Sequence, residues 1–320
     1  MADASPKLII LIPCLNEERT LPVTLAALPR SAPGVSRIET LVVNDGSTDA
    51  TVDTARRLGV EHILDLNRRQ GLARAFQAGL LEAARLGADY AVVLDADNQY
   101  NAADIPLLLE PLERGEADIV VGERPIDSID SFSPVKKLLQ RLGSWVVRRL
   151  SGAPVRDTPS GFRSYNRRAM LRLIIFDDYT YTQESLIAAR EAGLRVVGVP
   201  IRINPEVLRE SRLIKSLAGY VARSALTIFR SYLLYNTAGL LAALGAALGL
   251  AGLAGVGRFL YYFVVNGGAG HVQSLVLSAV LLTAAMLLFI LAVVSEVLRA
   301  NRRLLQMTLA ELREQRYGRP

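Results

Sequence analysis

The sequence predicts an α/β domain with a mostly parallel sheet, followed by a C-terminal transmembrane helical hairpin. Continuous Val, Ile and Leu strands alternate with helical segments over the first two thirds of the 320 residues. The last third carries two long apolar runs without a charged residue. We therefore divide the chain into an α/β domain (1–210), amphipathic juxtamembrane helices (211–235), a two-helix hairpin (236–297) and a helical tail (298–320).

Several short patterns predict the strands and helices of the first domain. Strands are expected at 7–13, 38–43, 60–66, 90–94 and 118–122, where apolar runs end in polar or turn-forming residues. Helices are expected at 17–28, 50–59 and 72–87, and the last of these repeats Leu80, Ala83, Ala84 and Gly87 on one face. Alternating strands and helices imply a sheet that is covered on both faces.

The segment 211–235 mixes basic and apolar residues at helical spacing. Lys215, Arg223 and Arg230 interleave with leucine, isoleucine and aromatic residues. This pattern suits an amphipathic helix at a membrane interface, and an ordinary surface helix is the alternative.

The runs at 237–257 and 274–294 are long enough to cross a bilayer. Gly245 and Gly249 would permit close packing of the two helices. Lysines and arginines crowd the outer flanks of the pair, so we expect an integral cell-membrane protein whose α/β domain and both termini are cytoplasmic. The glycine pair and the leucine-bearing tail also suggest a homo-oligomer.

The composition of the chain limits the classes of partner and the types of site that we expect. A net charge of +6 fits nucleic acid, an anionic membrane surface or a phosphorylated substrate, and of these we expect membrane lipid and a phosphorylated substrate but no nucleic acid. Cys14 is the single cysteine, which excludes an intrachain disulfide and a four-cysteine zinc site. The first residues lack the pattern of a signal peptide.

Two aspartates follow the strand at 90–94. Asp95 and Asp97 leave the carboxyl end of that strand together, at the edge where open α/β sheets bind ligands. Two carboxylates at an open site suit Mg²⁺ or Mn²⁺ shared with substrate phosphates. A calcium-binding EF-hand loop is excluded because Tyr100 and Pro106 occupy its glycine and glutamate positions. A solvated turn is the alternative.

Asp45 follows the strand at 38–43, within "VVNDGSTDAT". At the same sheet edge it could accept hydrogen bonds from a nucleobase or ribose, and a plain Asp-Gly turn is the equal alternative. Neither a dinucleotide-binding G-x-G-x-x-G pattern nor a P-loop follows any strand.

Five motifs in order carry a resemblance: "IPCLNEE", "VVNDGSTD", "LDADNQ", "DTPSGFRSYNRRAM" and "YTQESLI". This set resembles family 2 glycosyltransferases over about residues 7–235, and most of all their polyprenyl- and dolichyl-phosphate branch. The resemblance implies a GT-A fold, a nucleotide-diphosphate sugar donor, a divalent metal on Asp95 and Asp97, a polyprenyl phosphate acceptor and inversion at the anomeric carbon. Asn44 departs from the paired aspartates usual in the second motif.

The resemblance, together with the chemistry of phosphate recognition, selects the candidate site residues. Asp95, Asp97, Arg163 and Glu184 are expected to be catalytic. Donor binding is expected from Pro13, Leu15, Asn16, Glu17, Asp45, Gly71, Asp95, Ala96, Asp97, Gln99 and Arg124. Acceptor phosphate binding is expected from Lys136, Lys137, Arg141, Arg163, Arg209, Ser211, Arg212 and Lys215. A membrane-facing basic patch is the equal alternative for the first three, and a structural ion pair is the less favoured alternative for Arg163. Asp157 and Glu184 match motif positions, and either could orient an arginine or sugar hydroxyls.

The function that follows is hexosyl transfer from a donor of the UDP-glucose or GDP-mannose type to polyprenyl phosphate, either undecaprenyl or dolichyl. Another sugar, such as an N-acetylhexosamine, or another lipid acceptor is the alternative. A nucleotidyltransferase is less favoured because the first strand runs into "PCLNEE" without a glycine-rich basic loop. A non-catalytic scaffold has no use for the paired aspartates, and a processive synthase would need a Q-x-x-R-W motif that the sequence lacks.

Overall fold

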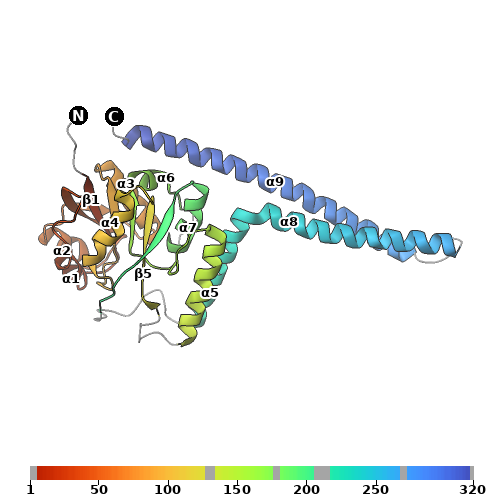
Figure 1. The fold of residues 1–320 in the computed structure, drawn as a ribbon, viewed down its shortest axis with the longest axis horizontal. Helices are drawn as coiled ribbons and strands as arrows, with labels where there is room; N and C mark the ends of the chain where they lie inside the picture. Colours follow the sequence, from red (N-terminus) through yellow and green to blue (C-terminus); the bar gives the residue numbers. More distant parts are fainter. Residues whose placement is uncertain (1–5, 127–133, 176–180, 205–216, 267–271, 318–320) are drawn as a thin grey trace. The chain divides into compact units, whose positions relative to one another are not determined.

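The structure is a computed structural model that describes residues 6–126, 134–175, 181–204, 217–266 and 272–317. The chain divides into two compact units, one formed by Met1–Ile228 with Gln306–Pro320 and the other by Phe229–Leu305. The first unit holds the sheet, and the second holds most of two long helices (Figure 1).

A seven-stranded sheet in the order β3-β2-β1-β4-β6-β5-β7 forms the centre of the first unit. The strands are β1 (Lys7–Cys14), β2 (Arg37–Asn44), β3 (His62–Asp65), β4 (Tyr90–Val93), β5 (Ile119–Glu123), β6 (Arg163–Asn166) and β7 (Val196–Pro200). The pairs β1–β2, β1–β4, β2–β3 and β5–β7 are parallel, and β6 runs antiparallel to β4 and β5. The predicted mostly parallel sheet is therefore confirmed, while β6 and β7 were not predicted.

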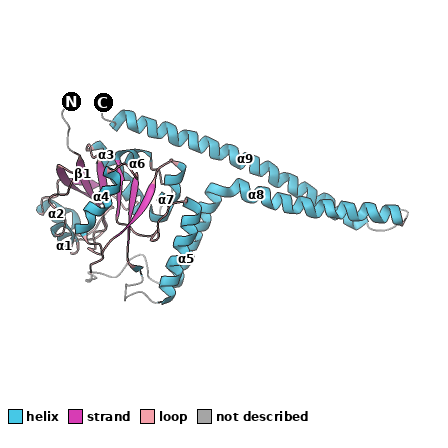
Figure 2. Ribbon diagram, in the orientation of Figure 1, coloured by secondary structure: helices cyan, strands magenta, loops and turns pink. Residues whose placement is uncertain are grey.

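Helices cover both faces of this sheet (Figure 2). They are α1 (Leu21–Ala26), α2 (Thr51–Arg57), α3 (Leu72–Arg85), the short 3₁₀ turn η1 (Ala102–Asp104), α4 (Ile105–Glu113), α5 (Pro134–Ser151), α6 (Arg167–Arg172) and α7 (Tyr181–Glu191). Phe76 and Leu80 of α3 join Ile9 and Leu11 of β1 in one core. Leu108 of α4 joins the alternate β1 residues in a second core on the other face. Burial on both faces explains why the strands read as continuous apolar runs.

The antiparallel direction of β6 shapes the edge that carries the site. Arg163, the first residue of β6, pairs with Val93 near the end of β4 and with Val121 of β5. The segment that precedes β6 is thereby delivered to the carboxyl edge of the parallel strands. The strand order also reverses between β1 and β4, which is where open α/β sheets place ligands.

The second unit contains parts of two helices, α8 (Leu217–Val265) and α9 (Val272–Tyr317). Within the described residues, Thr237–Val265 and Val272–Tyr317 are long and apolar enough to cross a membrane, which indicates a membrane protein. The boundaries predicted at 235 and 297 fall inside continuous helices.

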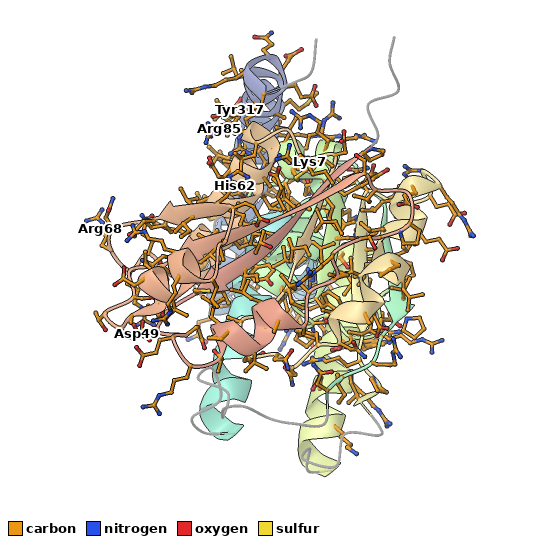
Figure 3. The ribbon with its side chains drawn as sticks, turned by 90° about the vertical axis from the view of Figure 1, so that its left-hand side faces the viewer. Lys7, Asp49, His62, Arg68, Arg85 and Tyr317 are labelled. Carbon is orange, nitrogen blue, oxygen red and sulfur yellow. The ribbon has the colours of Figure 1, made fainter. Side chains whose placement is uncertain are left out.

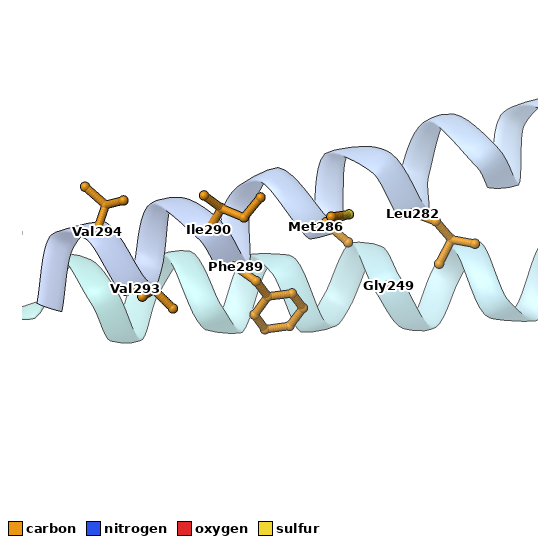
Figure 4. Close-up of a pocket in the computed structure, with 8 residues that line it drawn as sticks. Gly249, Leu282, Met286, Phe289, Ile290, Val293 and Val294 are labelled. Carbon is orange, nitrogen blue, oxygen red and sulfur yellow. The ribbon is translucent and has the colours of Figure 1, made fainter. Parts of the chain in front are cut away.

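Glycines of α8 face α9 in this unit. A Cβ atom on Gly245 would lie 3.2 Å from the carbonyl oxygen of Ala285, and one on Gly249 would lie 3.7 Å from the Ala285 Cβ. The expected close packing at the glycine pair is therefore confirmed within one chain. An apolar groove lies over the same contact and offers no group for chemistry (Figure 4). It is lined by Gly249, Leu282, Ala285, Met286, Phe289, Ile290, Val293 and Val294.

The end of α9 belongs to the first unit, where it contacts α6. The Nε atom of Arg172 lies 2.9 Å from Oε1 of Glu314, and Arg313 donates to the Leu171 carbonyl oxygen at 3.2 Å. Arg167 donates to the carbonyl oxygen of Tyr317, whose side chain lies near Arg85 (Figure 3). The structure therefore packs one side of this tail on its own catalytic unit. Leu304, Leu305, Leu309 and Leu312 stay exposed, so the self-association that these leucines suggest stays a prediction.

Candidate functional site

The loops after β1 and β2 are bonded to each other at the carboxyl edge. The Asn16 amide donates to Ser47 Oγ at 2.9 Å, and Asn16 Oδ1 accepts from the Thr48 amide at 2.7 Å. The Glu17 amide donates to Thr51 Oγ1 at 2.8 Å, and the buried Glu17 carboxylate accepts from Thr20 Oγ1 at 2.6 Å. Asn16 and Glu17 thus fix the shape of this edge, and their predicted donor contacts would come in addition to these bonds.

Asp49 reinforces the same junction (Figure 3). Burial works to raise the pKa of its carboxyl, but hydrogen bonds from the Thr51 hydroxyl and from the amides of Glu18 and Thr51 outweigh it and hold the pKa below its usual value. The ionised carboxylate is the form that accepts these bonds, so the junction is stable at neutral pH.

Asp45 faces the loop before α3. Its Oδ1 accepts from the Gln70 amide at 2.6 Å, and its Oδ2 accepts from the Gly71 amide at 3.0 Å. Gly71 has a φ of 99° at the start of α3, a conformation that favours glycine. Gly46 packs so closely here that a Cβ would lie 2.4 Å from the Arg69 nitrogen. The structure gives Asp45 and Gly71 a role in holding this loop, and donor binding by either stays a prediction.

The hydrogen bonds of the Asn44 side chain explain why this position carries an asparagine and not the expected aspartate. Its Nδ2 donates to Asp65 Oδ1 at 3.0 Å, and its Oδ1 accepts from the Ser47 amide at 3.0 Å. Asn44 is buried, so an aspartate here would place a second carboxylate against that of Asp65.

Asp95 and Asp97 lie in the turn that follows β4, and both are half-buried. Asp97 Oδ1 accepts from the Gln99 amide at 3.2 Å, and Asn98 takes a φ of 57° between them. Thr24 Oγ1 donates to the Ala96 carbonyl oxygen at 2.9 Å, which ties this turn to α1. Among the described residues no group of three or more His, Cys, Asp or Glu side chains could hold a metal, so protein ligands beyond this pair would have to be of another kind.

Gly161 lies against the Asp95 carboxylate. A Cβ at Gly161 would lie 2.9 Å from Asp95 Oδ2. The Gly161 amide donates to the Tyr100 hydroxyl at 2.9 Å, and the Tyr181 hydroxyl donates to the Gly161 carbonyl oxygen at 3.2 Å. Full burial raises the pKa of Tyr100 to about 12 and that of Tyr181 well above 10.0, and the Asp95 carboxylate adds to both shifts. Both hydroxyls therefore stay protonated and hold Gly161 beside Asp95.

Arg163 corrects one expectation. Its side chain is 0% exposed, and its guanidinium donates to the carbonyl oxygens of Ser160 and Thr158 at 2.8 and 2.7 Å and to Ser185 Oγ at 2.7 Å. It also lies over the Tyr181 ring, 6.0 Å from the centroid. A buried guanidinium with these partners is not placed to bind a lipid phosphate, so we assign Arg163 to the positioning of the 158–161 loop.

The Arg124 guanidinium also forms an ion pair within the protein. Its Nε and Nη2 atoms donate to the two oxygens of Asp157 at 2.6 and 3.0 Å, and Asp157 is 1% exposed. Gln140 of α5 adds a bond from Nε2 to Asp157 Oδ1 at 3.0 Å. Asp157 is therefore placed to orient Arg124, one of the two alternatives expected for it, and a contact with sugar hydroxyls stays a prediction. Donor binding by Arg124 stays a prediction.

For the remaining candidate residues the structure gives the burial of the side chain or no description. Pro13 is buried in β1, Leu15 and Gln99 are half-buried, and Glu184 is 2% exposed in the first turn of α7. On α5, Lys137 is half-buried and Arg141 is exposed. The Lys136 side chain, and the whole of Arg209, Ser211, Arg212 and Lys215, lie outside the described residues.

Tyr100, Gly161 and Tyr181 were missed as site residues, although each lies within or beside a motif that resembles the family. Two further polar atoms, Ser160 Oγ and Gln183 Oε1, are buried without a hydrogen-bond partner in the part of the chain that the structure describes. The sequence signals for Tyr100, Gly161 and Tyr181 were a tyrosine directly after "DADNQ", a glycine before the Phe-Arg pair and the tyrosine that opens "YTQESLI".

The family model described as glycosyl transferase family 2 matches residues 9–195, which includes both aspartates and the Gly161 loop. The chain belongs to this family. This glycosyltransferase is 33% identical over 220 residues to an uncharacterized glycosyltransferase of Mycobacterium tuberculosis, covering 68% of this chain and 94% of that protein. It is 30% identical over 250 residues to the undecaprenyl-phosphate mannosyltransferase of Micrococcus luteus, covering 75% of this chain and 99% of the relative.

Two further proteins are similar to this glycosyltransferase. The polyprenol monophosphomannose synthase of Mycolicibacterium smegmatis is 26% identical over 216 residues, covering 64% of this chain and 80% of the relative. The crystal structure of glucosyl-3-phosphoglycerate synthase from Mycobacterium tuberculosis, in complex with Mn²⁺, UDP and glucosyl-3-phosphoglycerate, matches with a TM-score of 0.55 at 21% identity. That match covers 72% of this chain and 80% of that one, and it confirms the expected fold.

Proposed function

We propose that this glycosyltransferase moves a hexose from a nucleotide-diphosphate sugar to polyprenyl phosphate with inversion at the anomeric carbon. The observation that carries the proposal is the match over 99% of the Micrococcus luteus undecaprenyl-phosphate mannosyltransferase. Two helices long enough to cross a membrane support a lipid acceptor. The relatives' names favour mannose among the hexoses, and the donor would then be of the GDP-mannose type.

Asp95 and Asp97 fit a divalent cation. They are two half-buried carboxylates in one turn at the ligand-binding edge, an oxygen donor set that suits Mg²⁺ or Mn²⁺ sharing the donor's diphosphate. Mn²⁺ bound with UDP in the structurally similar synthase supports this assignment. When bound, the cation would act as a Lewis acid toward the leaving nucleoside diphosphate.

The acceptor phosphate requires cations rather than a general base. A phosphate monoester with a second pKa of about 6 is largely dianionic at neutral pH and is itself the nucleophile. Basic side chains must hold it against the repulsion of the donor's phosphates. Lys136, Lys137 and Arg141 of α5 and the segment with Arg209, Ser211, Arg212 and Lys215 remain our candidates, whereas Arg163 is withdrawn.

Transfer to labelled lipid tests the proposal. Membranes containing the full chain would be incubated with polyprenyl phosphate and a panel of radiolabelled nucleotide sugars, and we expect one hexose to enter the lipid phase. Asp95→Asn should abolish transfer because the metal loses a charged ligand, whereas Asp53→Asn, an exposed aspartate of α2, should leave it unchanged. Electron paramagnetic resonance of Mn²⁺ should show weaker metal binding to Asp95→Asn than to the wild type, and unchanged metal binding to Asp53→Asn.

Two results would contradict the proposal separately. Label that stays in the water phase for every donor would reject the lipid acceptor. Full transfer and unchanged Mn²⁺ binding in Asp95→Asn would reject the metal assignment while leaving the acceptor intact.

A further inference from the structure

The turn that carries the two aspartates, residues 95–100 and called the aspartate turn below, is bonded to Asn204. This asparagine follows β7 and donates to the carbonyl oxygens of three consecutive residues of the turn. Its Nδ2 atom lies 2.8 Å from the oxygen of Asn98 and 3.1 Å from that of Tyr100, and its amide nitrogen lies 2.9 Å from that of Gln99. One residue therefore fixes the backbone of the second half of the turn.

Asn98 lies at the centre of these contacts and has an uncommon backbone conformation. Its φ is 57°, in the left-handed region that residues other than glycine adopt infrequently. Asn204 Nδ2 also lies 3.2 Å from Asn98 Oδ1, so one group contacts both the side chain and the carbonyl of Asn98. Asp97 precedes Asn98, and its Oδ1 accepts from the Gln99 amide at 3.2 Å. A change of backbone conformation at Asn98 would therefore redirect the Asp97 carboxylate.

The segment that presents Asn204 is itself fixed to the core. Ile201 is 5% exposed, and its amide donates to the carbonyl oxygen of Glu123 at the end of β5 at 3.0 Å. The Arg202 amide donates to Oδ2 of Asp104 at 2.6 Å, and Asp104 is 1% exposed in η1. Asn204 thus acts from a rigid support, which is what the precise placement of a metal ligand requires.

We propose that Asn204 is a positioning residue that holds Asp97 in the geometry needed for the divalent cation. The inference rests on the proposed function, since it takes Asp95 and Asp97 as the residues that bind the cation. Asn204 lies outside residues 9–195, so the family match assigns it no role. The alternative is a residue that only anchors the end of β7, and that role predicts no change in metal binding.

Hydrogen exchange of the metal-free full chain in detergent tests the contact itself. Asn204→Leu keeps the branched shape of the side chain but removes its hydrogen-bond donors. We expect exchange in the peptide covering residues 95–101 to become roughly fivefold faster, a factor typical of one lost hydrogen bond. Unchanged protection of β1 and β2 would show that the domain remains folded.

Electron paramagnetic resonance of Mn²⁺ tests the consequence for the metal. In titrations with GDP and, separately, with UDP, Asn204→Leu should bind Mn²⁺ roughly fivefold more weakly than the wild type. Arg202→Ala is the matched control in the same segment, because the Arg202 side chain donates to Asp104 Oδ1 at 2.9 Å and so acts on η1 and not on the aspartate turn. It should keep the wild-type affinity for Mn²⁺.

Three results would overturn the positioning role. They are unchanged exchange in Asn204→Leu, faster exchange with unchanged Mn²⁺ affinity, and an equal loss of Mn²⁺ affinity in Arg202→Ala. A wild-type chain that binds no Mn²⁺ would reject the proposed metal site and this role with it. Failed sugar transfer to lipid would alter none of these readouts, so the two proposals can fail separately.

Discussion

Single residues around Asp95 show how the site is kept in shape. Gly161 leaves room for the carboxylate, and the hydroxyls of Tyr100 and Tyr181 hold the glycine's two backbone polar groups. Tyr181 also stacks on Phe76 of α3, with ring centroids 4.0 Å apart. The position of Asp95 is therefore set by buried groups that are continuous with the core.

Gly161→Ala tests this arrangement. The new Cβ would lie 2.9 Å from Asp95 Oδ2, so the carboxylate must shift by a few tenths of an ångström. We expect roughly tenfold lower turnover and weaker Mn²⁺ binding, because small displacements of catalytic groups are costly. Gly143→Ala in α5 is the control, since its Cβ would meet no atom within 4 Å. Equal Mn²⁺ affinity in the two variants would show that Gly161 does not position Asp95.

Arg163 is a structural residue in this account, and a stability measurement can show it. Arg163→Ala would leave two buried carbonyl oxygens and the Ser185 hydroxyl with fewer donors, so we expect a loss of about 3 kcal/mol in the free energy of unfolding. Arg156→Ala, an exposed arginine of the same loop, should have little effect. Chemical unfolding of the detergent-solubilised chain gives both values. Unchanged stability together with a raised KM for polyprenyl phosphate would restore the phosphate-binding role.

At the scale of elements, apolar patterning was enough for most of the domain. The five predicted strands all form, and the helix expected at 72–87 runs from Leu72 to Arg85. Strand β7, "VVGVP", was missed although it is an apolar run. Strand β6 was missed because "RSYN" is polar and short, and it becomes a strand only by pairing between β4 and β5. That pairing is long-range and leaves no local periodicity in the sequence.

The site shows a similar division. The position of Asp95 and Asp97 at the carboxyl edge follows from strand order and could be predicted. The partners of Arg163 and Arg124 could not be predicted, because an arginine in a motif has the same letter whether it faces phosphate or a buried carbonyl. Only the antiparallel β6 brings Arg163 into the interior, where it bonds Thr158 and Ser160.

At the scale of the whole molecule, the two units differ in composition and in the residues that they carry. The sheet unit carries the carboxylates and the loops that hold them, and the other unit is apolar along most of its length. The end of α9 returns to the first unit through Glu314 and Arg172. The chain therefore leaves the first unit before the membrane pair and belongs to that unit again after it.

This connection leads to a prediction about topology. If both helices cross the membrane, the catalytic unit and both termini lie on one side and the 267–271 connection on the other. The positive-inside rule assigns the catalytic side to the cytoplasm, because Arg299, Arg302 and Arg303 follow the second apolar run. Cys14 is 2% exposed, so the native thiol should react slowly and leave a low background.

Labelling of single-cysteine variants of the chain in intact cells would decide the orientation. Gly268→Cys in the connection should react with an impermeant maleimide added outside, whereas Arg30→Cys on the exposed surface of the catalytic unit should react only after the cells are opened. The wild-type chain, with Cys14 alone, gives the background. Labelling of Arg30→Cys from outside would reverse the orientation. If Gly268→Cys reacted only in opened cells, as Arg30→Cys does, the helices would lie on the membrane without crossing it, and the short connection could not reach the far side.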